Sequence, residues 1–163
     1  MQKLSSLKPH RYIFTLATSL AVFMVSVAYC ETTETYQLAL LIAAPWKGET
    51  AMYHDVVAMT ETLRSRGFSS EEILALEDAL NRQKLMSFLH NAHQRVATWS
   101  NGEVFLYISG HGGFTGTTVS SARPAVMLAN TLSDDTEHWV FCDEVFAALG
   151  VPDHIQFILL PDT

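Results

Sequence analysis

Residues 103–113 read Glu-Val-Phe-Leu-Tyr-Ile-Ser-Gly-His-Gly-Gly, and the fold follows from this stretch. Residues 103–108 are mostly apolar, with aromatic and β-branched side chains, and they predict a buried strand. The glycines around His111 predict a loop in which backbone can approach a substrate closely. A histidine there could act as a general acid or base near pH 7. The amide of Gly112 could donate to a developing oxyanion.

The rest of the chain alternates between strand and helix patterns. The apolar run 37–44 predicts a strand buried on both faces. The other predicted elements are a helix from residue 52 that ends before Gly67, a strand at 73–76, a helix at 81–99, a loop at 114–138 with a short apolar run at 125–129, a helix at 143–149 and a strand at 154–160. This order predicts an α/β fold with a mostly parallel central sheet and helices on both faces. Function gathers outside the carboxyl ends of such strands, where His111 and Asp162 both lie.

Length and charge limit the possible functions. The 163 residues suit one domain, and 48% of them are apolar. The net charge is −7, and residues 1–28 hold three bases and no acid, so the remaining 17 acids and 7 bases give −10. This charge argues against a nucleic-acid or anionic-membrane surface and is compatible with a basic substrate.

The first 28 residues predict an export signal. Lys3, Lys8 and Arg11 precede an uncharged, mostly apolar stretch, and Ala28 ends a small-residue cleavage site. A retained membrane anchor is the alternative, because the uncharged stretch of about 19 residues just reaches spanning length. In both cases the part of the chain after the signal is exported. It is secreted or periplasmic if the signal is cleaved, and it is held by a single-pass membrane anchor if the signal is retained. Residues 29–35 would be a polar spacer and 36–163 the folded domain.

Two short motifs carry a family resemblance. Residues 109–112 read Ser-Gly-His-Gly, and the last predicted strand runs into Asp162-Thr163. This resembles the caspase-like cysteine peptidases, in particular the metacaspase-type bacterial caspase-domain proteins. In that family one strand ends in Ser-Gly-His-Gly and a later one in Asp-x-Cys-His-Ser-Gly. The resemblance covers residues 36–163 and implies a three-layer caspase-like fold, incomplete at its C-terminus. The nucleophilic cysteine would follow Thr163, so we expect residues 1–163 alone to have no peptidase activity.

The resemblance also implies roles for individual residues. His111 would be the histidine of a Cys-His dyad, and Gly112 an oxyanion donor. Asp55, Ser109 and Asp162 would form the pocket for a basic substrate side chain, since buried carboxylates pair well with guanidinium or ammonium groups. The substrate would be a polypeptide. We expect no cofactor and no metal site. In particular we expect no calcium site, because only Asp143 is acidic where calcium-using metacaspases carry paired acids.

Three alternatives remain open at this stage. Cys142 could be a nucleophile, because a following helix can lower a thiol's pKa, but Asp143 and Glu144 disfavour a thiolate and we expect a structural cysteine. The chain could be a non-catalytic caspase-like module that binds other proteins, or the product of a disrupted gene. It could also be a legumain-like cysteine peptidase, since that group also has a His-Gly after a strand.

Overall fold

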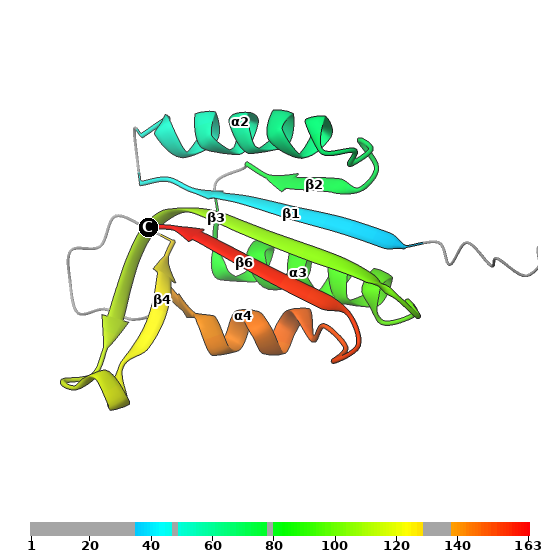
Figure 1. Ribbon diagram of the computed structural model, residues 1–163. Helices are drawn as coiled ribbons and strands as arrows, with labels where there is room; N and C mark the ends of the chain where they lie inside the picture. Colours follow the sequence, from blue (N-terminus) through cyan, green and yellow to red (C-terminus); the bar gives the residue numbers. More distant parts are fainter. Residues whose placement is uncertain (1–34, 47–48, 78–79, 129–137) are drawn as a thin grey trace, which may run out of the picture. The chain divides into compact units, whose positions relative to one another are not determined.

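The computed structural model describes residues 35–46, 49–77, 80–128 and 138–163 (Figure 1). The predicted export signal, Cys30 and almost all of the predicted spacer lie outside the described residues. No helix within the described ranges has the length and apolar character needed to cross a membrane.

The described part of the chain contains a six-stranded mixed sheet. Its strands are β1 (Tyr36–Ala44), β2 (Ile73–Leu76), β3 (Gly102–Thr115), β4 (Arg123–Met127), β5 (Trp139–Phe141) and β6 (Gln156–Asp162). The order is β2-β1-β3-β4-β5, and β6 pairs with β3. β2, β1, β6 and the first part of β3 run parallel, whereas the second part of β3, β4 and β5 pair antiparallel. The predicted α/β class is confirmed, with an antiparallel extension on the parallel sheet.

Helices cover both faces of the parallel strands (Figure 1). The helix α2 (Ala51–Ser65) packs on one face, and α3 (Arg82–Val96) and α4 (Cys142–Leu149) pack on the other. The central strand β1 is buried on both sides: its residues 38–44 are at most 1% exposed and alternate between the two apolar clusters. A continuous apolar run is what a strand covered on both faces requires.

The prediction that the strand containing residues 103–108 gives way to a loop is wrong. The strand β3 continues to Thr115, and its second part forms a hairpin with β4, in register from His111 opposite Met127 to Thr115 opposite Arg123. The turn contains a short 3-10 helix, η1 (Val119–Ser121). The predicted loop at 114–138 therefore contains β4, formed in part by the apolar run.

The glycines of β3 are required for close packing, although in the sequence they are typical of a loop. A Cβ atom on Gly110 would lie 2.7 Å from the Cβ of Ala44 in β1, and one on Gly113 would lie 3.0 Å from the Trp139 ring. Glycine is needed because neighbouring chains approach too closely for a side chain. The strand therefore keeps its extended conformation while it changes partners between Gly110 and His111.

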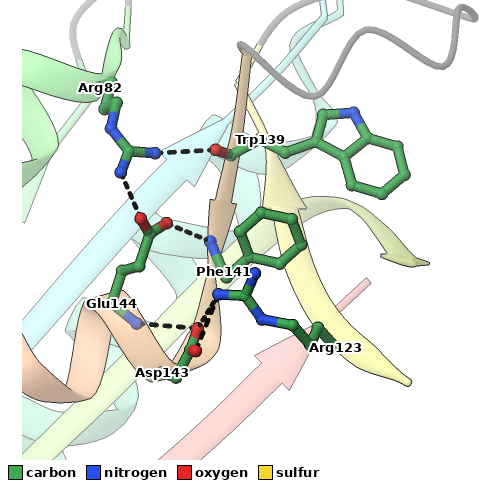
Figure 2. Close-up of polar contacts among 6 residues, drawn as sticks. All are labelled: Arg82, Arg123, Trp139, Phe141, Asp143 and Glu144. Carbon is green, nitrogen blue, oxygen red and sulfur yellow. Dashed lines mark hydrogen bonds and ion pairs between the residues drawn. The ribbon is translucent and has the colours of Figure 1, made fainter. Parts of the chain in front are cut away.

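Two arginines hold β5 and the start of α4 in place (Figure 2). Arg82 of α3 pairs with Glu144, whose carboxylate also accepts the backbone N–H of Phe141 at 3.0 Å. Arg123 of β4 pairs with Asp143 at 2.8 Å, and its guanidinium lies 4.0 Å from the centre of the Phe141 ring. These arginine hydrogen bonds lower the pKa of both carboxyl groups. Both acids at the start of α4 are thus engaged by arginines.

Candidate functional site

The candidate site lies at the carboxyl ends of β1 and β6, beside the point where β3 changes from parallel to antiparallel pairing. Ser109 of β3 is in register with Ala43 of β1 and with Asp162 of β6. Side chains two residues apart on a strand point to the same face, so Tyr107, Ser109 and His111 share one face of β3. That face is the one covered by α2, because Tyr107 belongs to the α2 cluster. Ser109, His111 and Asp162, which the sequence predicted as site residues, therefore lie at the same end of the parallel strands.

Ser109 joins β3 to α2 through Asp55. The Ser109 hydroxyl donates to Oδ2 of Asp55 at 2.8 Å, and Ser109 is only 2% exposed. A buried hydroxyl without a partner is costly, so this bond fixes both side chains. Asp55 lies one turn into α2 and is half-buried, and its carboxylate faces Ser109.

Tyr107 forms a second hydroxyl–carboxylate pair in the same place. Its hydroxyl donates to Oδ2 of Asp162 at 2.9 Å. Burial raises the pKa of Tyr107 to about 12, helped by the bond to Asp162 and the negative charges of Asp162 and Asp55. We call Asp55, Tyr107, Ser109 and Asp162 the acidic cluster. The sequence prediction contained three of its members and missed Tyr107, for which the period-two spacing with Ser109 and His111 was the available signal.

His111 lies beside two residues that precede α2. Its Nε2 atom is 2.9 Å from Oε2 and 3.1 Å from Oε1 of Glu49. The Trp46 indole stacks on the imidazole with ring centroids 3.8 Å apart. The backbone N–H of Trp46 also donates to Oε2 of Glu49 at 2.9 Å; this bond and the one from His111 lower the pKa of Glu49. No sequence pattern assigns a role at the site to Glu49 or to Trp46.

Gly112 lies in β3 opposite Val126, and not in the predicted loop. A Cβ atom at Gly112 would lie 2.8 Å from the Cβ and Oγ1 atoms of Thr163, so Thr163 packs directly against this glycine. A cavity of about 490 Å³ opens beside them, and its lining is mostly apolar. The lining includes Gly112, Gly113, Cys142, Phe146, Pro161 and Thr163.

Cys142 lies apart from His111. It begins α4, which covers the face of the sheet opposite α2. Burial, and then the charge of Asp143, raise the pKa of the Cys142 thiol. A thiol in this environment stays protonated near neutral pH and is a poor nucleophile. Within the described ranges, no group of three or more His, Cys, Asp or Glu side chains is placed to hold a metal ion.

Comparison with known proteins returns no match, either to a protein-family model or to a curated protein. The resemblance to caspase-like peptidases therefore stays a prediction from residues 109–112 and Asp162.

Proposed function

We propose that this chain carries the histidine and the specificity pocket of a caspase-like cysteine endopeptidase domain of the metacaspase type, with a basic residue preferred before the cleaved bond. The main support is the position of His111 and the acidic cluster on one face of β3, at the carboxyl ends of parallel strands. A three-layer caspase-like fold is part of the same proposal, and the helices on both faces of the sheet are compatible with it.

The acidic cluster has the chemistry to bind an arginine or lysine side chain. Asp55 and Asp162 each accept a hydroxyl through Oδ2. In the described structure neither takes part in an ion pair. Their Oδ1 atoms remain to accept N–H groups, and charge-assisted bonds to a planar guanidinium are strong and directional. Tyr107 stays neutral at physiological pH, so the two carboxylates dominate the local charge.

In the proposed reaction a cysteine thiol gives its proton to His111, and the sulfur bonds to the peptide carbonyl carbon. The amide of Gly112 would stabilise the oxyanion. The amine then leaves with the proton from His111, and water attacks the acyl-enzyme and regenerates the thiol. The family resemblance implies that the cysteine directly follows Thr163. Thr163 packs against Gly112, so a residue that followed it would lie next to the strand that carries His111.

The test uses the protein extended through the reading frame that follows codon 163. We expect a cysteine codon first, and cleavage of fluorogenic peptides with arginine or lysine before the bond. His111→Ala should abolish cleavage, and Cys142→Ser should retain it. Asp55→Asn and Asp162→Asn should lower kcat/KM for the arginine peptide, whereas Glu61→Gln, on the exposed side of α2, should not. Cleavage that requires Cys142, or a reading frame with no cysteine and no activity, would refute the peptidase proposal.

A non-catalytic module that binds basic peptides is the second candidate. The observation in its favour is that Cys142, the one cysteine in the described ranges, lies on the opposite face from His111. Such a module would bind an arginine peptide more tightly than its citrulline analogue, and lose that preference in Asp55→Asn. Titration calorimetry on chain 1–163 measures this directly. Binding without cleavage by the extended protein would favour the module over the peptidase.

A further inference from the structure

Glu49 makes the closest polar contact of His111, although neither sequence pattern nor family resemblance assigns it a role. We propose that Glu49 is a positioning residue that fixes the orientation of His111 and keeps the proton of the neutral imidazole on Nε2. The consequence for catalysis rests on the proposed peptidase function, but the effect on the imidazole does not.

The side chain and the backbone of Glu49 are both hydrogen-bonded to the backbone of Trp46. The Trp46 backbone N–H donates to Oε2 of Glu49 at 2.9 Å, and the Glu49 backbone N–H donates to the carbonyl oxygen of Trp46 at 3.1 Å. The Trp46 indole also stacks on the imidazole. The stacking sets the plane of the ring, and the hydrogen bond sets its rotation within that plane. Trp46 and Glu49, which lie between β1 and α2 in the sequence, therefore position His111 on β3.

The chemistry of the contact determines which nitrogen carries the proton. An ionised carboxylate only accepts hydrogen bonds, so Nε2 must be the donor. The lowered pKa of Glu49 keeps this carboxylate ionised at neutral pH. A neutral His111 then presents its lone pair on Nδ1, which becomes the nitrogen that takes a proton from a nucleophile. Once protonated, the imidazolium gains a charge-assisted bond to Glu49, which stabilises the state formed by proton transfer.

Glu49 can affect two separate quantities, the stability of the fold and the position of the imidazole proton. The side chains of His111 and Glu49 are 33% and 37% exposed, and solvent-screened pairs of this kind contribute little to folding. Loss of Glu49 should therefore change stability little. Its effect should appear in the position of the imidazole proton, because without Glu49 the tautomer with the proton on Nδ1 becomes accessible in water.

The experiment observes the imidazole directly, on uniformly ¹⁵N-labelled chain 1–163. Long-range ¹H–¹⁵N correlation spectra at about pH 9, where free imidazole is neutral, distinguish a protonated nitrogen from one with a lone pair. The His111 signals are assigned from their loss in His111→Gln. We expect Nε2 to be protonated and Nδ1 to carry the lone pair. Glu49→Ala should give averaged signals from both tautomers, and Glu49→Gln should restore the original pattern, because its amide oxygen still accepts the bond.

Glu61→Ala is the matched control, since it removes an equal charge from the exposed side of α2 and should leave the His111 signals unchanged. A main tautomer with the proton on Nδ1, or a Glu49→Ala spectrum identical to that of the unsubstituted chain, would refute the proposal. The spectrum of the unsubstituted chain can refute the proposal even if Glu49→Ala fails to fold, because a proton on Nδ1 would contradict it. These spectra need no substrate, so absence of peptidase activity would leave their result standing.

In an active peptidase, misorientation of the imidazole should lower kcat in Glu49→Ala by about a hundredfold, with KM nearly unchanged. Glu49→Gln should recover most of that loss. An unchanged kcat in Glu49→Ala, measured in an enzyme that requires His111, would refute the catalytic role while leaving the peptidase function intact.

Discussion

Tyr107→Phe should remove a pH-dependent contribution to stability that arises from the acidic cluster. The Tyr107 hydroxyl donates to Asp162, and the folded protein raises the pKa of this tyrosine from 10.0 to about 12. Because the folded state holds the phenolic proton more tightly than the unfolded chain, the contribution is complete below pH 10. It declines as the pH rises from 10 towards 12.

The size of the effect follows from the two pKa values. At pH 11 the unfolded tyrosine is mostly ionised and the folded one mostly neutral, so linkage predicts a loss of about 1.3 kcal/mol between pH 9 and 11. At neutral pH the phenylalanine variant should be less stable by about 1 kcal/mol, because it lacks the hydrogen bond. The stability difference between the two proteins should therefore shrink to near zero by pH 11.

The assay is urea unfolding followed by circular dichroism at pH 7, 9, 10 and 11. Other tyrosines and lysines also titrate in this range, so the informative quantity is the difference between the unsubstituted chain and Tyr107→Phe. Tyr36→Phe, at a tyrosine that is 42% exposed, controls for the removal of a tyrosyl hydroxyl. A difference that stays constant from pH 9 to 11 would show that Tyr107 is not buried against Asp162 as described.

Three further changes probe the framework of the site. Gly110→Ala should destabilise the fold by about 1–3 kcal/mol in urea unfolding, because the new Cβ would lie 2.7 Å from the Cβ of Ala44; an unchanged midpoint would contradict the close strand approach. Asn81→Ala should cost about 1 kcal/mol, since this side chain caps α3 by accepting a backbone N–H at 2.9 Å; full stability of the Asn81→Ala protein would argue against capping. The hydrogen bond from the Ser69 N–H lowers the pKa of Glu72, so ionised Glu72 stabilises the fold above pH 4.5 and this stabilisation is lost as the pH falls. In Glu72→Gln the melting temperature should therefore fall less steeply between neutral and acid pH. An equally steep fall in both proteins would contradict this role of Glu72.

Much of the fold was predictable from local patterns. The predicted strand at 73–76 coincides with β2, and the helix predicted at 81–99 contains α3, which is capped at Asn81. The apolar run 37–44 forms all but the first residue of β1. These predictions hold because hydrophobic periodicity and capping act within one segment, and burial of the resulting faces then agrees with them.

The hairpin of β3 and β4 was not predictable in the same way. The glycines at 110, 112 and 113 are typical of a loop, yet they lie in a strand, because partners on other segments come too close for side chains. A strand that pairs in parallel over its first part and antiparallel over its second leaves no periodic signal of the change. The cause lies in Ala44, Trp139 and Thr163, which are distant in the sequence.

The candidate site, like the fold, was only partly predictable from the sequence. The position of His111 and Gly112 after a predicted strand singled them out, and the family resemblance added Asp55, Ser109 and Asp162. The sequence by itself indicated which residues could perform chemistry, but the expectation that His111 and Asp162 follow strands is wrong, because they lie within β3 and β6. Only the tertiary structure decided that Tyr107 bonds to Asp162 and that Glu49 and Trp46 hold His111. These contacts depend on strand register and on the path of the chain after β1, which are set by packing between segments rather than by any local pattern.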